Sequence, residues 1–149
     1  MIRVRADLHI HTVLSACADL GMSPVNIVNA AKEKKIDLIA ITDHNSTLHC
    51  SLVKELADEK GISVLCGVEV TTREEVHCLA YFENQATLEI FQKYLDEHLP
   101  RLPYLPEQFG YQIIVDKEEK IIRMVENYLN VSISQSIDQV EQEVHRLGG

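Results

Sequence analysis

The stretch LIAIT (residues 38–42) is a short, uninterrupted apolar run of the kind that a buried parallel strand shows. Helical patterns flank it on both sides. Before it, Ser23 and Pro24 have the pattern of an N-cap and a first-turn proline, and they open a predicted helix that runs to about Lys35. After it, apolar residues at helical spacing predict a second helix, which Gly61 ends. A buried strand between two helices favours a βα architecture.

Further elements extend this pattern in both directions, and we expect one domain over residues 1–149. Its core of βα units covers residues 1–99, followed by a proline-rich loop at 100–110. The remaining part, 111–149, is expected to hold a strand or hairpin and a final helix. The other expected elements are strands at 3–8, 62–70, 76–82 and 111–116 (pairing with part of 120–125), a third helix that stops before Pro100, and a last helix at about 136–147.

Composition narrows the classes of protein. The chain has 149 residues, 46% of them hydrophobic, which is enough for one globular domain with a core. A net charge of −9 without any basic block argues against nucleic acid or an anionic membrane surface as a partner. No apolar run approaches the roughly 20 residues of a membrane span, and the start lacks a signal-peptide core. We therefore expect a cytoplasmic protein, and a small anionic substrate only where cations invert the local potential.

The four cysteines contain no close CxxC pair and are expected to be reduced, structural thiols. In an alternative interpretation, Cys17 or Cys50 is a soft metal ligand near the histidines. Cys66 and Cys78 are expected to pack on strands.

Polar side chains follow three successive predicted strands. His9 and His11 close the first strand, Asp43 and His44 the second, and Glu69 the third. Because strands that alternate with helices favour a parallel sheet, and ligands gather at the carboxyl ends of parallel strands, we expect these side chains to meet.

These residue types at this spacing predict a metal site. His9 and His11 are two apart on an extended segment, so their rings project to the same side. Glu69 has two oxygens and can bridge two ions, and His77 lies on the next strand. Mixed imidazole and carboxylate ligands suit zinc, manganese or iron better than magnesium or calcium. Three further histidines on predicted helices are expected to be surface residues: His49, His98 and His145.

Three segments together resemble the PHP (polymerase and histidinol phosphatase) superfamily, and more specifically its small prokaryotic metal-dependent phosphoesterases. These segments are DLHIHT (7–12), ITDHN (41–45) and GVEVTT (67–72), in the family's order and spacing. The resemblance implies a distorted seven-stranded βα barrel with up to three divalent ions at the carboxyl ends of its strands. It implies the following ligands: His9, His11 and Glu69 for the first ion, Glu69 and His77 for the second, and His44 and Asp19 for the third.

The resemblance also implies hydrolysis of a small phosphorylated metabolite or nucleotide by a metal-activated hydroxide. We expect Glu69, Arg73 and Asp43 to take part in catalysis. Arg73 would reach a phosphate oxygen, or alternatively would pair with a neighbouring glutamate on the surface. Asp7 and Asp43 would orient the imidazoles, or alternatively cap strand ends. Asp19 has the alternative of a loop turn or a solvent-facing carboxylate.

The chain also departs from the family, because the later family motifs, an Ala-His and an Asp-x-His, do not occur in it. We therefore expect an incomplete PHP-type α/β domain, a partial barrel with parallel strands, outer helices and its C-terminal strands missing. An open sheet edge would allow homo-oligomers. Two alternatives to the phosphoesterase stay open: a non-catalytic metal-binding or interaction module, and another amidohydrolase-like metal hydrolase.

Overall fold

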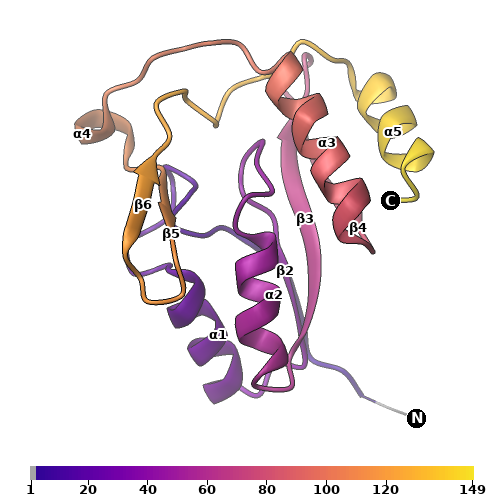
Figure 1. Cartoon of the computed structure of the whole chain (residues 1–149). Helices are drawn as coiled ribbons and strands as arrows, with labels where there is room; N and C mark the ends of the chain where they lie inside the picture. The colour runs from indigo at the N-terminus through magenta and orange to yellow at the C-terminus, as the bar shows by residue number, and fades with distance from the viewer. Residues whose placement is uncertain (1–2) are drawn as a thin grey trace.

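The structure is a computed structural model that describes residues 3–149 (Figure 1). Its elements, in chain order, are β1 (Ala6–Ile10), α1 (Pro24–Glu33), β2 (Leu38–Ile41), α2 (Cys50–Asp58), β3 (Ser63–Thr71), β4 (His77–Phe82), α3 (Gln85–His98), α4 (Pro106–Phe109), β5 (Ile113–Val115), β6 (Ile121–Met124) and α5 (Ile137–Arg146). The predicted start of α1 is confirmed, since the Ser23 side chain accepts a hydrogen bond from the Asn26 backbone N–H and Pro24 stands in the first turn.

Four strands form one sheet in the order β1-β2-β3-β4. The pairs β1–β2 and β2–β3 are parallel, as expected for βα units. The predicted buried strand is confirmed, because β2 lies between β1 and β3 and Ile39, Ala40 and Ile41 are fully buried. The domain thus has a mixed α/β architecture, and within residues 3–149 its sheet does not close into a barrel.

The fourth strand runs in the opposite direction to the other three. β4 pairs antiparallel to β3, with Thr71 opposite His77. Only residues 72–76 connect the two strands, whereas a parallel connection needs a crossover of about a dozen residues or more. A turn in which Glu75 adopts φ 62° reverses the chain.

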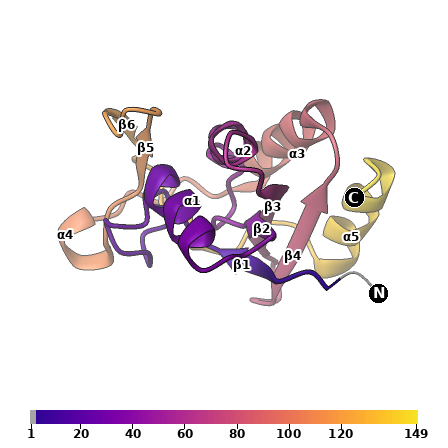
Figure 2. The ribbon, with the colours of Figure 1, turned by 90° about the horizontal axis from the view of Figure 1, so that it is seen from below.

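Helices α1, α2 and α3 lie on one side of the sheet, as Figure 2 shows, and α5 lies beside β4. Their apolar faces form the main core together with the inward side chains of β2 and β3. In α3, the predicted core positions Leu88, Phe91 and Leu95 are buried. Within residues 3–149, no helix combines the length and the apolar composition that a membrane span requires.

The C-terminal part begins with the loop after Pro100, which contains the short helix α4 instead of being irregular throughout. The predicted pairing of 111–116 with part of 120–125 is confirmed as the antiparallel hairpin β5–β6. Gln112 anchors this part, since its fully buried side chain donates to Asn127 and accepts from the Leu129 backbone N–H. The last helix, α5, begins at Ser136 with a capping box.

Candidate metal centre

Glu69 is the centre of a cluster of four imidazoles. Its Oε2 lies 2.9 Å from His9 Nε2 and 2.7 Å from His11 Nε2. Its Oε1 lies 2.7 Å from His77 Nδ1. His44 Nδ1 is 3.7 Å from Oε2, beyond hydrogen-bonding distance. The structure therefore brings together five of the six predicted metal ligands.

The sheet places these side chains at one end. His9 lies in β1 and His11 directly after it, and their Nε2 atoms are 3.1 Å apart, so the predicted common orientation of the two rings is confirmed. Beyond the end of β2, His44 forms a parallel bridge with Glu69. The antiparallel turn puts His77 opposite Thr71, two residues from Glu69 and therefore on the same face of the sheet.

Electrostatics favour a charged Glu69 and a neutral His44. Burial tends to raise the pKa of Glu69, but hydrogen bonds from His9 and His77, with the nearby charges of His44 and His11, outweigh it and lower the pKa to about 2. Burial, followed by repulsion from the charge of His11, lowers the pKa of His44 to about 4. At neutral pH the cluster thus offers one carboxylate and a neutral imidazole whose lone pair is available to a cation.

The donor set fits divalent cations. Two groups of potential ligand atoms meet at Glu69, His9–His11–Glu69 and His44–Glu69–His77, and within each group the atoms lie no more than 4.8 Å apart. His44 Nδ1 is buried and has no hydrogen-bond partner among residues 3–149. A buried polar atom without a partner is costly, and a cation facing the ring would remove that cost. Imidazole and carboxylate together suit zinc, manganese or iron.

Asp19, the predicted partner of His44, does not join these groups. It is exposed, and its Oδ1 accepts a hydrogen bond from the Gly21 backbone N–H at 2.7 Å, which corresponds to the alternative of a loop turn. Cys17 lies near the cluster instead, with Sγ 3.1 Å from His11 Nδ1. The long loop after β1 therefore presents a thiol, and not a carboxylate, to the histidines.

Asp43 forms hydrogen bonds with the segment after β1 and not with the imidazoles of the cluster. It is buried, and its carboxylate accepts hydrogen bonds from Thr12 N–H, Thr12 Oγ1 and Ser15 Oγ. Ser15 Oγ in turn accepts from the His44 backbone N–H. Burial raises the pKa of Asp43, and the hydrogen bonds of Ser15 and Thr12 oppose that rise. Asp43 thus holds the segments that carry His11 and His44.

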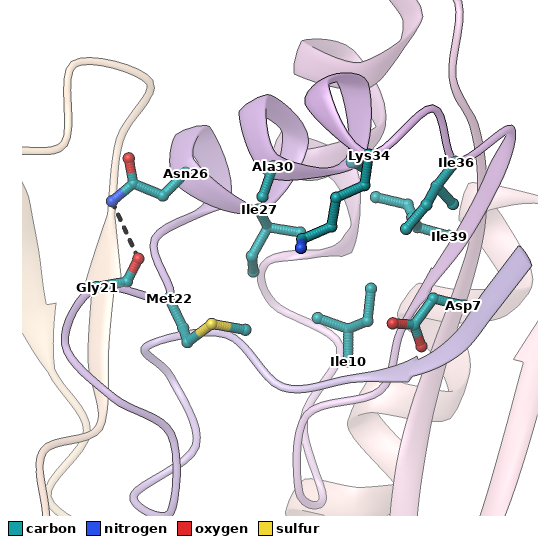
Figure 3. Close-up of a pocket in the computed structure, with 11 residues that line it drawn as sticks. Asp7, Ile10, Gly21, Met22, Asn26, Ile27, Ala30, Lys34, Ile36 and Ile39 are labelled. Atoms are coloured by element: carbon teal, nitrogen blue, oxygen red, sulfur yellow. Dashed lines mark hydrogen bonds between the residues drawn. The ribbon is translucent and has the colours of Figure 1, made fainter.

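Two other predicted polar residues lie apart from the cluster. The Arg73 guanidinium is 3.3 Å from the Glu74 carboxylate on the surface, which is the alternative considered from the sequence. Asp7 accepts a long hydrogen bond from the His9 backbone N–H, 3.4 Å, and does not bond to an imidazole. It lines an apolar pocket of about 380 Å³ between β1 and α1 (Figure 3). None of the five cluster residues lines that pocket.

The prediction that His49 is a surface residue is wrong. His49 is 1% exposed, and its Nδ1 is 2.7 Å from Thr12 Oγ1 while Nε2 accepts from the Val115 backbone N–H. Burial lowers its pKa, so it is held neutral. It precedes the first helical turn of α2, where helical periodicity gives no signal for such a role. His145 is exposed, as predicted, and pairs with Glu141, whereas His98 is partly buried and contacts Gln135.

Comparison with known families identifies the fold. A sequence profile of the PHP domain matches residues 7–146. The chain belongs to the PHP domain family. The match extends well beyond the three N-terminal segments and includes the hairpin and α5.

Characterised and uncharacterised relatives each match about half of this PHP chain. An uncharacterized protein of Methanocaldococcus jannaschii is 39% identical over 79 residues, which cover 48% of this chain and 46% of the relative. The 5'-3' exoribonuclease Rnm of Escherichia coli is 34% identical over 73 residues, 48% of this chain and 24% of the relative. The chain therefore spans less than half the length of these relatives.

Solved structures share the architecture. A Bifidobacterium adolescentis protein, provisionally named a metal-dependent phosphoesterase, superposes with a TM-score of 0.69 at 20% identity, over 98% of this chain and 65% of that one. An amidohydrolase from Chromobacterium violaceum, solved with sulfate and without metal, has a TM-score of 0.51 at 28% identity, over 63% of this chain and 34% of that one. The first likeness confirms a PHP-type α/β fold.

Proposed function

We propose that this protein is a metal-dependent phosphoesterase that hydrolyses a small phosphorylated metabolite or nucleotide. The observation that carries the proposal is the position of Glu69, whose Oε2 faces His9 and His11 while its Oε1 faces His77. A carboxylate in that place suits two neighbouring cations. Membership of the PHP family and the fold of the Bifidobacterium protein support a metal-dependent hydrolase.

Bound divalent cations would supply Lewis acidity toward a phosphoryl oxygen and would lower the pKa of a water molecule that attacks phosphorus. The residues of the chain prepare the place for both. Glu69 stays ionised because its pKa is about 2, and His44, with a pKa of about 4, stays neutral at pH 7. His9 and His77 have side chains that are 49% and 47% exposed, so the cluster is open to a substrate from solvent.

We propose zinc, manganese or iron as the cations, with up to three ions in the centre. The nitrogen-rich donor set supports this choice over magnesium and calcium. The test is to strip the purified chain with a chelator, reload it with each metal, and measure bound metal by elemental analysis. Preferential binding of magnesium or calcium would contradict the choice.

Activity is tested by phosphate release from phosphomonoesters, including nucleoside monophosphates, by the manganese- or zinc-loaded chain. Glu69→Gln should abolish turnover, while the matched control Glu74→Gln, on the surface beside Arg73, should retain it. Absence of hydrolysis with any phosphoester by the metal-loaded chain would overturn the proposal. Metal binding without turnover would instead favour the alternative of a non-catalytic metal-binding module.

A nuclease is the second candidate function, because the Escherichia coli relative bears the name of an exoribonuclease. The net charge of −9 argues against a long nucleic acid as the substrate, since the 14 Lys and Arg side chains are outnumbered by 23 Asp and Glu side chains, which repel phosphates. A 5'-phosphorylated short oligoribonucleotide in the same assay separates the two functions. Release of nucleotides from it at a higher kcat/KM than phosphate from monoesters would favour the nuclease.

A further inference from the structure

A thiol lies next to the cluster, beside the His11 ring nitrogen that does not face Glu69. Cys17 lies in the loop between β1 and α1, and its Sγ is 3.1 Å from His11 Nδ1. Sγ and one ring nitrogen each from His11 and His44 form a group of potential ligand atoms that lie within 4.8 Å of one another. His11 stands between this group and Glu69, because its Nε2 faces the carboxylate.

A second observation points to an ion beside His44, whose Nδ1 lies 3.7 Å from Glu69 Oε2. The His44 side chain is only 6% exposed, yet its Nδ1 has no hydrogen-bond partner among residues 3–149. Native proteins rarely leave a buried polar atom unpaired, and an ion that the structure does not contain is one recognised explanation. His44 is also the residue that the Cys17 group and the His44–Glu69–His77 group share.

The spacing of the donors suits a cation. In a tetrahedral zinc site with nitrogen and sulfur ligands, neighbouring donor atoms are roughly 3.3–3.8 Å apart, from bond lengths of about 2.0–2.3 Å. The 3.1 Å between Cys17 Sγ and His11 Nδ1 is close to this range, so a small outward movement would admit an ion.

The loop that carries Cys17 is held on both sides. On one side, Asp43 accepts hydrogen bonds from Thr12 and Ser15. On the other, the backbone of Ala16 packs against Gly110 so closely that a Cβ there would meet the Ala16 oxygen at 1.9 Å. The Asp19 carboxylate faces the Gly21 N–H instead of the histidines. The loop is therefore built to present sulfur at this position.

We infer that Cys17 is a thiolate ligand, together with His11 and His44, of one cation in the centre, and that this position prefers zinc to manganese or magnesium. The inference rests on the proposed metal centre. Binding would form one sulfur–metal bond and two nitrogen–metal bonds and would release the thiol proton to solvent, while the proton of His11 stays on Nε2, where Glu69 Oε2 accepts it. Thiolate favours soft and borderline cations, whereas an all-oxygen loop ligand would favour manganese or magnesium.

Cobalt(II) is the probe that tests this inference, because a cobalt–thiolate bond absorbs in the near ultraviolet and a cobalt–imidazole or cobalt–carboxylate bond does not. The metal-free chain is titrated with cobalt and the bound metal is counted. We expect the charge-transfer band in the wild type and in the control Cys78→Ser, whose thiol is partly buried on β4 and outside the cluster. In Cys17→Ser the band should vanish, with one fewer ion bound or an affinity lower by roughly 10- to 100-fold.

The variant Cys17→Asp adds a test of selectivity. It should bind metal without the band and shift the preference from zinc toward manganese in competition experiments. Unfolding curves check that all variants fold, which is expected because Cys17 is exposed. Cobalt binding to the wild type without the band would show that Cys17 only orients His11, and would overturn the inference. So would failure to bind cobalt at all, or a band that persists in Cys17→Ser.

These readouts do not depend on turnover. A chain that shows the Cys17-dependent band but hydrolyses no phosphoester retains the thiolate ligand and loses the proposed function. A chain that hydrolyses phosphoesters without the band keeps the function and loses the ligand.

Discussion

At the residue scale, Glu69 carries the largest share of the site. It is 5% exposed and faces three imidazoles at 2.7–2.9 Å. It lies on β3, which pairs parallel with β2 and antiparallel with β4. Its position was predictable, because GVEVTT ends a recognisable strand. Its contact with His77 depends on the antiparallel direction of β4, which the sequence pattern did not predict.

Replacing this carboxylate tests the central role. Glu69→Gln keeps the size of the side chain. It removes the negative charge that both groups of ligand atoms share and replaces one of the two oxygens by an amide nitrogen. We expect zinc affinity to fall by at least about 10- to 100-fold, the loss that removal of even an outer partner of a metal ligand causes. Equilibrium dialysis with elemental analysis measures the loss. Unchanged stoichiometry in the variant would refute the site, and Glu74→Gln serves as the control.

The pH dependence of the metal-free protein tests the environment of His44. Its pKa of about 4 in the folded protein lies below the ordinary value of 6.5. Between these pH values the unfolded chain binds a proton that the folded protein does not, so the free energy of unfolding should fall as the pH drops from 6.5 toward 4. Glu69, with its pKa lowered from 4.5 to about 2, adds a further loss below pH 4.5.

Urea unfolding at pH 7 and pH 5, in the presence of a chelator, measures this loss. His44→Gln should reduce the difference between the two pH values, because the titrating imidazole is gone. His145→Gln, which removes an exposed imidazole on α5, should leave the difference as in the wild type. An equal difference in His44→Gln and wild type would contradict the explanation.

At the scale of elements, the loop between β1 and α1 connects the site to the hairpin. Gly110 has φ +97°, and a Cβ there would lie 1.9 Å from the Ala16 oxygen, next to Cys17. Val13 continues the contact, since its carbonyl accepts from the Ile113 backbone N–H. The path of this loop explains why Cys17 faces the histidines and Asp19 does not. Sequence spacing carries no signal for such a path.

Gly110→Ala tests that connection. We expect it to lower the free energy of unfolding by about 3 kcal/mol or more, because both the positive φ and the clash with Ala16 oppose a side chain. The matched control is Gly61→Ala, where φ is +68° but no atom lies within 4 Å, so only about 1–2 kcal/mol is expected. Urea unfolding compares the two. Equal losses would show that Gly110 does not pack tightly on the loop.

At the scale of the whole molecule, β1 forms one edge of the sheet, and within residues 3–149 no strand pairs with its outer side. Leu8, in β1, and Val4, just before it, are 41% and 57% exposed. An open edge with exposed apolar residues favours pairing with another strand. We therefore propose a homo-oligomer that forms through this edge, as the sequence led us to expect.

Sedimentation tests this proposal. The wild type is expected to have a mass near twice the chain's 16.9 kDa, and Leu8→Lys should shift it to a monomer because a charge on an edge strand opposes pairing. Ile90→Lys, an equally exposed position on α3, is the control that should stay dimeric. A wild type that is monomeric at all concentrations would contradict the proposal.

The sequence by itself determined the positions of the core strands and helices, because these depend on local periodicity. It also predicted, from spacing within short segments, which five residues meet at one end of the sheet: His9, His11, His44, Glu69 and His77. Only the tertiary structure decided three other features: the antiparallel direction of β4, the buried role of His49, and the choice of Cys17 over Asp19 beside His44. Each of these results from contacts between segments far apart in the chain or from the path of a loop. Pattern along the chain does not encode such contacts, and packing and buried hydrogen bonds select among them.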